Sequence, residues 1–380
     1  MNQRLLYSLI LLFTWVVFAF STLASPKCSE NLKYIKIENA VLAEKAGLLY
    51  ISPKDFSQSS IMRKKSGGNY SYFSSNGRKI TNKAELTRIQ NLNIPSAYHD
   101  VLISPDPLSH IQATALDAKE RMQYRYHPKW NEIKAEYKFI QIYHFGKALG
   151  NLRSTIRSDL GLKGLPYQKI QAVIVRLLDR TAIRIGNEEY AEANGSYGLT
   201  TFLKKHLRLD GTKITFSFLG KSSVRHSITI EDAKLARVLK ELKELPGKNL
   251  FQYIDEEEEL HSITSNDIND YISSNAEGTF SAKDFRTWTA TTLAAEEFWK
   301  LGPPPSTKKE LDSKIKQVMT TVSEKLGNTP SIARKSYVSP QIIEAYIEWN
   351  QFNTAFKKAN QTLHESEILS EKATLLVIKP

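Results

Sequence analysis

The pattern of apolar residues changes near His127-Pro128, and this change predicts a fold with two unlike parts. Before that point, short aromatic or β-branched stretches such as Asn69–Phe73 are separated by turn signals such as Asn76-Gly77. Ala84–Ile89 is the one short helical stretch expected there. Prolines break the remainder of this part into loops, at Pro95, Pro105 and Pro107. The sequence therefore predicts an α+β fold whose small N-terminal domain is rich in β-strands.

The second part is dominated by helical patterns from Ile133 onward, with one β-hairpin between the helices. One apolar face recurs at the spacing of an α-helix, in a helix expected to continue toward Arg184: Ile170, Val173, Ile174, Leu177 and Leu178. The hairpin is predicted by alternation on two strands around a turn at Gly220–Ser223: Ile214, Phe216 and Phe218 before it, and Val224, His226, Ile228 and Ile230 after it. We expect a mainly α-helical domain that carries this hairpin. The acidic run Asp255–Glu259 is expected to be a solvated loop, and Lys308 to open a long polar helix.

These patterns predict four segments along the chain. Residues 1–27 form a hydrophobic leader or anchor, 28–128 the β-rich domain, 129–355 the helical domain and 356–380 a C-terminal tail. Within the first segment, Leu5–Ala24 is uncharged and about 20 residues long, which is enough for a membrane span. It also resembles a secretory leader with a small-residue end at Leu23-Ala24-Ser25. A misassigned start codon and an unprocessed hydrophobic extension are the other interpretations.

Charge and cysteine content narrow the classes of partner and cofactor. The formal net charge is +12, and the isoelectric point is about 9.4. A basic surplus of this size favours a polyanion, with nucleic acid as the first candidate and anionic lipid as the second. Cys28 is the single cysteine, so one chain can form no disulfide framework and no cysteine-based zinc site. Neither an H-E-x-x-H pattern nor a phosphate-binding G-x-x-x-x-G-K-[ST] loop occurs, so we expect neither a metal nor a nucleotide cofactor.

Candidate chemistry is concentrated in the second half of the chain, in a few short segments. Each candidate has an ordinary structural interpretation when it is taken alone. Arg184 suits an ion-paired arginine, Lys221 a solvated turn residue, and Arg286 a cation–π contact between Phe285 and Trp288. Tyr337 suits a half-buried core tyrosine, and Asn328 a turn residue after Gly327.

Taken in order, the set of arginine, hairpin lysine, arginine and late tyrosine resembles the type IB DNA topoisomerases of the bacterial and poxvirus-like kind. The resemblance runs from about residue 46 to 350. Motifs outside the proposed catalytic residues also carry it: Gln123-Tyr-Arg-Tyr-His-Pro-Lys-Trp130, His110-Ile-Gln-Ala-Thr114, Leu48-Leu-Tyr-Ile51, Ile94-Pro95 and Leu245-Pro-Gly-Lys-Asn-Leu-Phe-Gln-Tyr-Ile-Asp255. The ordered agreement of this many segments makes the resemblance specific.

The resemblance implies the catalytic fold shared by type IB topoisomerases and tyrosine recombinases, and a role for each residue. Tyr337 is the expected nucleophile, and Arg184 and Arg286 bind the non-bridging phosphate oxygens. Lys221 protonates the leaving 5′-oxygen. The product is a 3′-phosphotyrosyl link, which conserves the bond energy, so relaxation of supercoiled DNA needs neither ATP nor metal. Asn328 stands where poxvirus and eukaryotic members carry histidine and where bacterial relatives often carry asparagine, and it is expected to donate one neutral hydrogen bond to the phosphate.

In the N-terminal domain, Gln123, Tyr124 and Tyr126 are expected to contact the double-stranded DNA that a monomer clamps. The chain departs from the family here at three positions. Relatives usually carry a positive charge, a glycine and a second positive charge at these positions, where this chain has Leu116, Glu120 and Met122, respectively. The grip on DNA or the site preference is expected to be weaker. The family match implies a cytoplasmic location with the nucleoid, and residues 5–24 are interpreted as a membrane tether, with an export signal as the alternative.

Two other classes of protein remain as alternatives. A tyrosine recombinase shares the chemistry but normally shows H-x-x-R before its second arginine, whereas this chain has Lys283-x-x-Arg286. A recombinase also lacks the His110–Thr114 and Gln123–Trp130 motifs. The second alternative, a non-catalytic DNA-binding protein tethered to a membrane, fits the basic charge and the apolar leader. The intact set of candidate catalytic residues argues against it.

Overall fold

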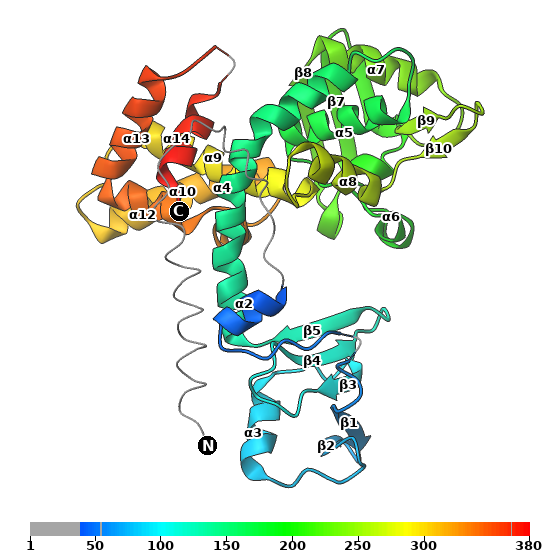
Figure 1. Ribbon diagram of the computed structural model, residues 1–380, viewed down its shortest axis with the longest axis vertical. Helices are drawn as coiled ribbons and strands as arrows, with labels where there is room; N and C mark the ends of the chain where they lie inside the picture. The colour runs from blue at the N-terminus through cyan, green and yellow to red at the C-terminus, as the bar shows by residue number, and fades with distance from the viewer. Residues whose placement is uncertain (1–38, 54, 366) are drawn as a thin grey trace, which may run out of the picture. The chain divides into compact units, whose positions relative to one another are not determined.

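The computed structural model describes residues 39–53, 55–365 and 367–380 (Figure 1). The N-terminal part holds α2 (Asn39–Lys45), β1 (Ile61–Ser66), β2 (Asn69–Phe73), α3 (Lys83–Asn91), β3 (His99–Ile103), β4 (Ile111–Leu116) and β5 (Met122–Tyr126). The rest of the described chain is mainly helical, as the sequence predicts. The expected α+β class is therefore confirmed. Leu5–Ala24 lies outside the described residues.

The second part contains the following elements in chain order. They are α4 (Pro128–Asp159), α5 (Tyr167–Thr181), α6 (Glu188–Asn194), η1 (Leu199–Thr201), η2 (Lys204–His206), β6 (Leu207–Asp210), β7 (Lys213–Leu219), η3 (Lys221–Ser223), β8 (Arg225–Glu231), α7 (Ala233–Glu244), β9 (Gln252–Ile254), β10 (Leu260–Ser262), α8 (Ser265–Asn275), α9 (Ala282–Leu301), α10 (Lys308–Leu326), α11 (Pro330–Ser336), α12 (Pro340–Glu348), α13 (Asn350–Gln361) and α14 (Leu369–Val377). Across the described ranges, no helix combines the length and the apolar character that a membrane crossing needs.

The N-terminal sheet is antiparallel, with strand order β2-β1-β3-β4-β5 (Figure 1). The β1–β2 hairpin turns through Gly67 and Gly68, whose φ angles are +54° and +89°. Two positive φ angles in a two-residue loop favour glycine, and such a loop fixes the register that pairs Met62 with Phe73. One face of the sheet packs on α3 around a small core of Ile61, Ile89, Val101, Ile103, Ala113 and Ala115.

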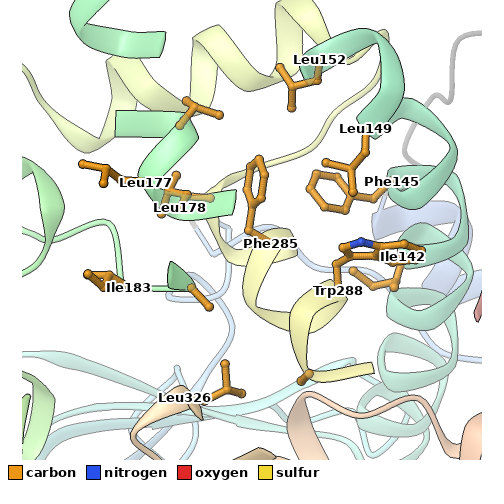
Figure 2. Packing of buried hydrophobic residues seen from close by; sticks show 14 of the residues in the cluster. Ile142, Phe145, Leu149, Leu152, Leu177, Leu178, Ile183, Phe285, Trp288 and Leu326 are labelled. Atoms are coloured by element: carbon orange, nitrogen blue, oxygen red, sulfur yellow. The ribbon is translucent and has the colours of Figure 1, made fainter. Parts of the chain in front are cut away.

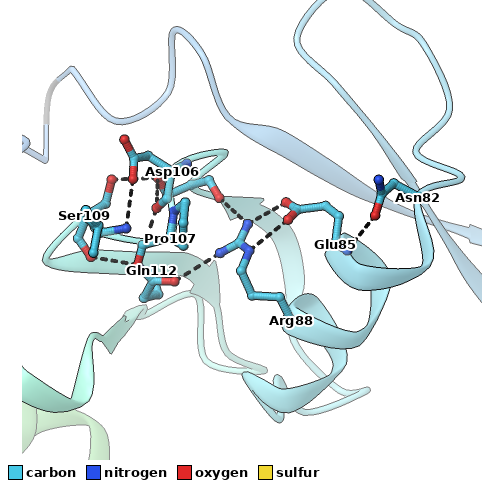
Figure 3. A network of polar contacts seen from close by, with 9 residues as sticks. Asn82, Glu85, Arg88, Asp106, Pro107, Ser109 and Gln112 are labelled. Carbon is cyan, nitrogen blue, oxygen red and sulfur yellow. Dashed lines mark hydrogen bonds and ion pairs between the residues drawn. The ribbon is translucent and has the colours of Figure 1, made fainter.

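A buried polar network attaches α3 to the sheet (Figure 3). Arg88 donates to Glu85 on its own helix at 2.6 Å, to the Oε1 of Gln112 at 3.0 Å and to the carbonyl of Ser104 at 2.6 Å. The amide nitrogen of Gln112 donates to the carbonyl of Ser109 at 2.7 Å. Gln112 lies in the His110–Thr114 motif, so at least this residue of the motif has a structural role within the N-terminal part.

At His127-Pro128 the change in apolar pattern predicts a linker between the two parts, but the chain begins a helix there. The side chain of His127 accepts from the backbone N–H of Lys129 and so caps α4. Pro128 occupies the first turn, where its missing N–H would have no partner in any case. α4 therefore continues directly from the end of β5. Its first turns pack against α2 through Trp130 and Tyr137.

The main core surrounds α5, whose predicted apolar face is fully buried: Ile170, Val173, Ile174, Leu177 and Leu178 are each 0% exposed. Figure 2 shows Leu177 and Leu178 near Phe285 of α9, with Phe145 of α4 beyond it. The rings of Phe145 and Phe285 meet edge to face with centroids 5.0 Å apart. α4 and α9 approach closely at Gly146, because a Cβ there would lie 2.3 Å from the ring of Trp288. α4, α5 and α9 thus form one packed unit.

α5 ends earlier than the sequence suggests. Ala182 adopts a left-handed conformation, with φ 53° and ψ 24°, and its N–H bonds to the carbonyl of Leu178. The chain leaves the helix at that residue, so Arg184 lies in an extended segment beyond it. The residues around Arg184 are apolar, like those of α5. The apolar pattern alone therefore placed the end of this helix too late.

The predicted β-hairpin is present, and a third strand, β6, pairs with it. β6, β7 and β8 form a three-stranded sheet in that order, and Leu219 and Arg225 make the last β7–β8 pair before the turn. Ile214 and Phe216 are fully buried, as the alternation predicts. The acidic run Asp255–Glu259 joins β9 to β10 and is exposed apart from the partly buried Asp255.

Residues 356–380, which the sequence assigns to a tail, contribute to the main core. Phe356 in α13 and Ala373 in α14 are almost fully buried. Arg153 of α4 forms ion pairs with Asp179 of α5 and Glu371 of α14, each at 2.7 Å. Trp288 of α9 donates its indole N–H to the same Glu371 at 3.2 Å. α14 is thus attached directly to α4 and α9, and through Arg153 to α5.

Candidate active site

Arg184 is fixed by the backbone that follows α5. Its carbonyl accepts from the N–H of Leu199, and the carbonyl of Ile185 accepts from the N–H of Thr200 at 2.7 Å. These bonds leave the half-buried guanidinium free to project from a rigid segment. Its Nη2 donates to the Oδ1 of Asn328 at 2.6 Å. The structure thus joins two of the residues that the sequence singles out, across 144 positions.

Asn328 follows the left-handed residue that ends α10, Gly327, whose φ is +60°. The backbone N–H of Asn328 returns to the carbonyl of Ser323 at 3.0 Å, which fixes the turn. With its oxygen bound to Arg184, the amide nitrogen of Asn328 is buried and has no hydrogen-bond partner among the described residues. A buried donor without a partner is costly and commonly marks the place of a ligand atom.

Arg286 on α9 is 5% exposed. Its guanidinium donates to the carbonyl of Ala182, at the end of α5, and to the carbonyl of Leu326 at 2.9 Å, at the end of α10. Burial and the nearby charge of Arg184 lower the pKa of Arg286 to about 10, so it stays charged at neutral pH. Its Nε is a second buried donor without a partner in the described structure. Arg286 therefore holds the ends of two helices together at the site.

Tyr337 caps α11 and is half-buried beside Arg286, whose guanidinium carbon lies 5.3 Å from the centre of its ring. Burial alone would raise the pKa of its hydroxyl. The positive charges of Arg286, Arg184 and Lys283 act in the opposite direction and bring the pKa of Tyr337 below its ordinary value. A lower pKa makes the phenolate, which is the nucleophilic form, easier to reach near neutral pH.

The main chain of Tyr337 is held from two sides. The hydroxyl of Thr291, fully buried on α9, lies 3.1 Å from the carbonyl of Tyr337 and 2.8 Å from the carbonyl of Thr287, and it shares its one proton between them. The ammonium of Lys138 on α4 donates to the carbonyl of Ser336, the preceding residue, at 2.7 Å. These two bonds flank the Cα of Tyr337 and fix the direction from which its side chain leaves the backbone.

Lys221 lies exposed in the β7–β8 turn. Ser222 and Ser223 after it have φ angles of +61° and +59°. A non-glycine residue in this region carries strain, and two in succession are found where the surroundings hold a turn in a required shape. The turn brings Lys221 to a groove of about 560 Å³ that Arg184, Arg286 and Tyr337 also line. Four of the predicted catalytic residues thus meet at one place, and the fifth, Asn328, is bound to Arg184.

His226 of β8 lies behind this groove, between the two turns that carry Lys221 and Asn328. A Cβ on Gly220 would lie 2.7 Å from its ring, and a Cβ on Gly327 would lie 2.1 Å from it. Its ring also stacks on Phe218, with centroids 5.0 Å apart. Burial, together with the charges of Arg184 and Arg286, lowers the pKa of His226. The imidazole is therefore neutral at neutral pH and fills the space that two glycines leave open.

The residues expected to contact DNA from the N-terminal part lie on β5, outside the lining of this groove. Tyr124 and Tyr126 are 37% and 39% exposed and stack on each other at 5.8 Å. The amide of Gln123 donates to Asp117 at 3.0 Å, so one side of that amide is already in use. Glu120, where relatives carry glycine, has a φ of +57°, a conformation that glycine adopts without strain.

Sequence patterns missed four residues that help to build this site: Lys138, His226, Lys283 and Thr291. Lys283 carried a visible signal, because it opens the Lys283–Trp288 motif, and it lines the groove. The other three act through contacts between distant segments. Among the residues that the structure describes, no group of three or more His, Cys, Asp or Glu side chains is placed to hold a metal ion.

Comparison with known proteins identifies the family to which this chain belongs. Residues 127–363 match the family described as "Eukaryotic DNA topoisomerase I, catalytic core", and residues 69–117 match "Bacterial DNA topoisomerase IB, N-terminal domain". The chain is 31% identical over 293 residues to DNA topoisomerase 1B of Acanthamoeba polyphaga mimivirus, a match that covers 75% of this chain and 87% of the viral protein. DNA topoisomerase 1B of vaccinia virus (strain Copenhagen) is 25% identical over 285 residues, covering 71% of this chain and 84% of the viral one. The first family match spans more than half of the chain and contains all five predicted catalytic residues. The chain therefore belongs to the type IB DNA topoisomerase family.

Proposed function

We propose that this type IB DNA topoisomerase relaxes supercoiled DNA through reversible attack by Tyr337 on one strand. The observation that carries the assignment is the convergence of Tyr337, Arg184, Arg286 and Lys221 on one groove. Each residue comes from a different element, so the fold, and not a single sequence motif, brings the four together. The family match supports the reaction class, and the geometry supports the role of each residue.

The groove suits a phosphodiester at the point where the two arginines approach Tyr337. Arg184 and Arg286 each present a planar set of donors that fits phosphate oxygens. Two buried donors nearby, the Nε of Arg286 and the amide nitrogen of Asn328, have no partner among the described residues. Phosphate oxygens would supply acceptors in this position. Because these donors are held before the substrate arrives, they stabilise the charge that develops as the phosphorane forms.

The proposed step exchanges one bond at phosphorus for another. The hydroxyl oxygen of Tyr337 loses its proton to solvent and attacks the phosphorus, and a bond forms between them. The bond from phosphorus to the 5′-oxygen breaks, and Lys221 donates a proton to that oxygen. The 3′-phosphotyrosyl bond replaces the phosphodiester, so the later attack of the 5′-hydroxyl reseals the strand without an external energy source. Rotation of the free strand between the two steps relaxes the duplex.

The test of the nucleophile is Tyr337→Phe, with Tyr143→Phe on α4 as the matched control. A supercoil-relaxation gel, run with EDTA and without ATP, should show activity in the control and none in Tyr337→Phe. Denaturing gels should show a covalent protein–DNA adduct in the control alone. Relaxation by Tyr337→Phe would refute the assignment.

A separate test addresses Lys221. Only a poor leaving group, such as the 5′-oxygen, needs the proton that Lys221 donates. Lys221→Ala should slow cleavage of ordinary DNA by about 10²–10⁴-fold, as for general acids elsewhere. A substrate with sulfur at the 5′-bridging position leaves without a proton and should restore the rate. An equal loss on both substrates would contradict the role.

Beyond the reaction, we propose that one chain acts as a monomer that clamps double-stranded DNA, with Gln123, Tyr124 and Tyr126 among its contacts. We also propose that it works in the cytoplasm with the nucleoid, where residues 5–24 tether it to the membrane. The length and apolar character of that segment support the tether. Light scattering on the purified chain tests the monomer. Cell fractionation with protease accessibility distinguishes a tether that leaves the enzyme in the cytoplasm from an exported protein.

A further inference from the structure

Lys138 is hydrogen-bonded to the segment that carries Tyr337, but the reaction proposed above gives Lys138 no role. α11 has seven residues and ends at Ser336, immediately before Tyr337. The last carbonyls of a helix have no partner within the helix. The carbonyl of Ala333 accepts from the N–H groups of Tyr337 and Val338, whereas that of Ser336 accepts from the ammonium of Lys138 on α4 at 2.7 Å. A cation at this end also suits the helix dipole.

In this position the ammonium of Lys138 is partly removed from water, which costs free energy. Its ammonium lies 4.2 Å from the centre of the Phe139 ring, and it is half-buried between α4, α9 and α11. Burial, and to a lesser degree the charge of Lys283, lower the pKa of Lys138 to about 8, while the carboxylate of Asp284 acts in the opposite direction. Asp284 also accepts from Gln141, one turn further along α4, at 3.3 Å. A lysine that merely solubilised the helix surface would avoid this cost, as the exposed Lys147 does on the same helix.

We propose that Lys138 is a positioning residue for the nucleophile: by holding the carbonyl of Ser336 to α4, it fixes the backbone from which Tyr337 attacks. The inference rests on the proposed role of Tyr337. Thr291 holds the carbonyl of Tyr337 itself, so the two donors fix the peptide groups on both sides of one Cα. Small displacements of a reacting group are expensive, and about 1 Å can cost on the order of 100-fold in rate. Because Lys138 is not among the residues that line the groove, its expected effect is on the attack by Tyr337 and not on the leaving group.

The experiment measures single-turnover cleavage of a DNA substrate whose released strand dissociates, so that religation does not interfere. Lys138→Met keeps the length of the side chain and removes the donor, and it should slow cleavage on the order of 10-fold, with DNA affinity unchanged. Lys138→Arg retains a charged donor and should recover most of the rate. Lys147→Met removes one positive charge from the same helix without touching α11 and should cleave like the wild-type chain.

The pH dependence separates positioning from simple stabilisation. The pKa of Lys138 is about 8, whereas a guanidinium stays charged throughout the range. As the pH rises from 7 to 9, the cleavage rate of Lys138→Arg relative to wild type should therefore increase. The contributions of groups that the two proteins share cancel from this ratio. Because Lys138 does not assist the leaving group, 5′-bridging sulfur should fail to rescue Lys138→Met.

The inference would be overturned by wild-type cleavage in Lys138→Met, by a ratio of Lys138→Arg to wild type that does not change with pH, or by rescue of Lys138→Met with the sulfur substrate. Loss of rate that merely follows a fall in the melting temperature, with no recovery in Lys138→Arg, would also overturn it. Tyr337→Phe is run in the same assay. If that variant forms an adduct, the proposed nucleophile is wrong, and this failure is distinct from a failure at Lys138.

Discussion

At the scale of single residues, Asn328 shows how a neutral side chain serves a site built from cations. Its oxygen accepts from Arg184 at 2.6 Å, and its buried nitrogen has no hydrogen-bond partner among the described residues. The amide of Asn328 can donate one hydrogen bond to a phosphate oxygen, whereas an arginine adds a positive charge and a second parallel bond. Asn328→Ala should therefore slow single-turnover cleavage by about 10-fold, and Arg184→Ala or Arg286→Ala by about 10²–10³-fold. Equal losses would show that Asn328 does more than orient Arg184 and donate one bond.

Asn328→His extends this prediction to pH. Asparagine does not titrate, so the wild-type rate should have no step near pH 6–7 that comes from this position. Histidine there should remain active and introduce such a step, because an imidazole titrates in this range. Its charged form would face Arg184 and Arg286, which favour the neutral form and move the step toward lower pH. A pH–rate profile of the variant that is identical to the wild type would contradict the contact.

Gly220 and His226 provide a second residue-scale prediction, because they touch beside Lys221. A Cβ at Gly220 would lie 2.7 Å from the His226 ring, so Gly220→Ala should displace the ring or the turn and slow cleavage. The double variant Gly220→Ala/His226→Ala removes the clash and should recover part of the rate. A thermodynamic cycle on cleavage rates measures this coupling. Additive losses in the two single variants would mean that the ring does not set the turn.

The residues of the site could be predicted from the sequence where each one lies in a motif that resembles the family. The roles of Arg184, Lys221, Arg286 and Tyr337 came from the resemblance, and the structure brings them together at one groove. Lys138, His226 and Thr291 could not be found in this way, because they act through contacts between segments that lie far apart in the sequence. Lys138 reaches across 198 positions to Ser336.

At the scale of elements, α14 shows why the C-terminal segment belongs to the core. Glu371 binds Arg153 at 2.7 Å and the indole of Trp288 at 3.2 Å, and its side chain is 18% exposed. Glu371→Ala leaves the charge of Arg153 with only Asp179 and should lower the free energy of unfolding by about 3 kcal/mol. Urea unfolding followed by circular dichroism measures the change. Glu365→Ala, at an exposed position in the preceding loop, is the control and should unfold like the wild-type chain. Unchanged stability in Glu371→Ala would show that α14 is held by apolar packing alone.

Local sequence patterns predicted several elements in the right place. β2, α3, α10 and the β7–β8 hairpin lie where the pattern places them. The end of α5 was misplaced because the left-handed turn at Ala182 has no glycine to mark it. The last segment was taken for a tail because α14 has only nine residues, and its docking depends on ion pairs with α4. Short elements that are stabilised by distant partners leave little local signal.

At the scale of the whole molecule, the excess of positive charge agrees with a partner that is a polyanion. The net charge is +12, and Lys283, Arg184 and Arg286 gather at the site. Net charge does not choose between nucleic acid and lipid, and the family assignment makes the choice for DNA. Each lysine or arginine that neutralises a phosphate releases a counterion, so binding must weaken as salt rises.

We therefore expect the affinity of Tyr337→Phe, which binds without cutting, to fall linearly on logarithmic axes as salt increases. With six or more phosphate contacts, the loss between 50 and 200 mM salt is about 10³-fold or more. Lys283→Gln in the same background should reduce the slope by about one, because Lys283 lines the groove. Lys300→Gln should leave the slope unchanged, since the ammonium of Lys300 is already paired with Glu296 at 2.7 Å and Glu297 at 3.0 Å. Fluorescence anisotropy with a short duplex measures all three slopes. A flat salt response would mean that the basic surface serves another polyanion, and vesicles of anionic lipid would then be the partner to test.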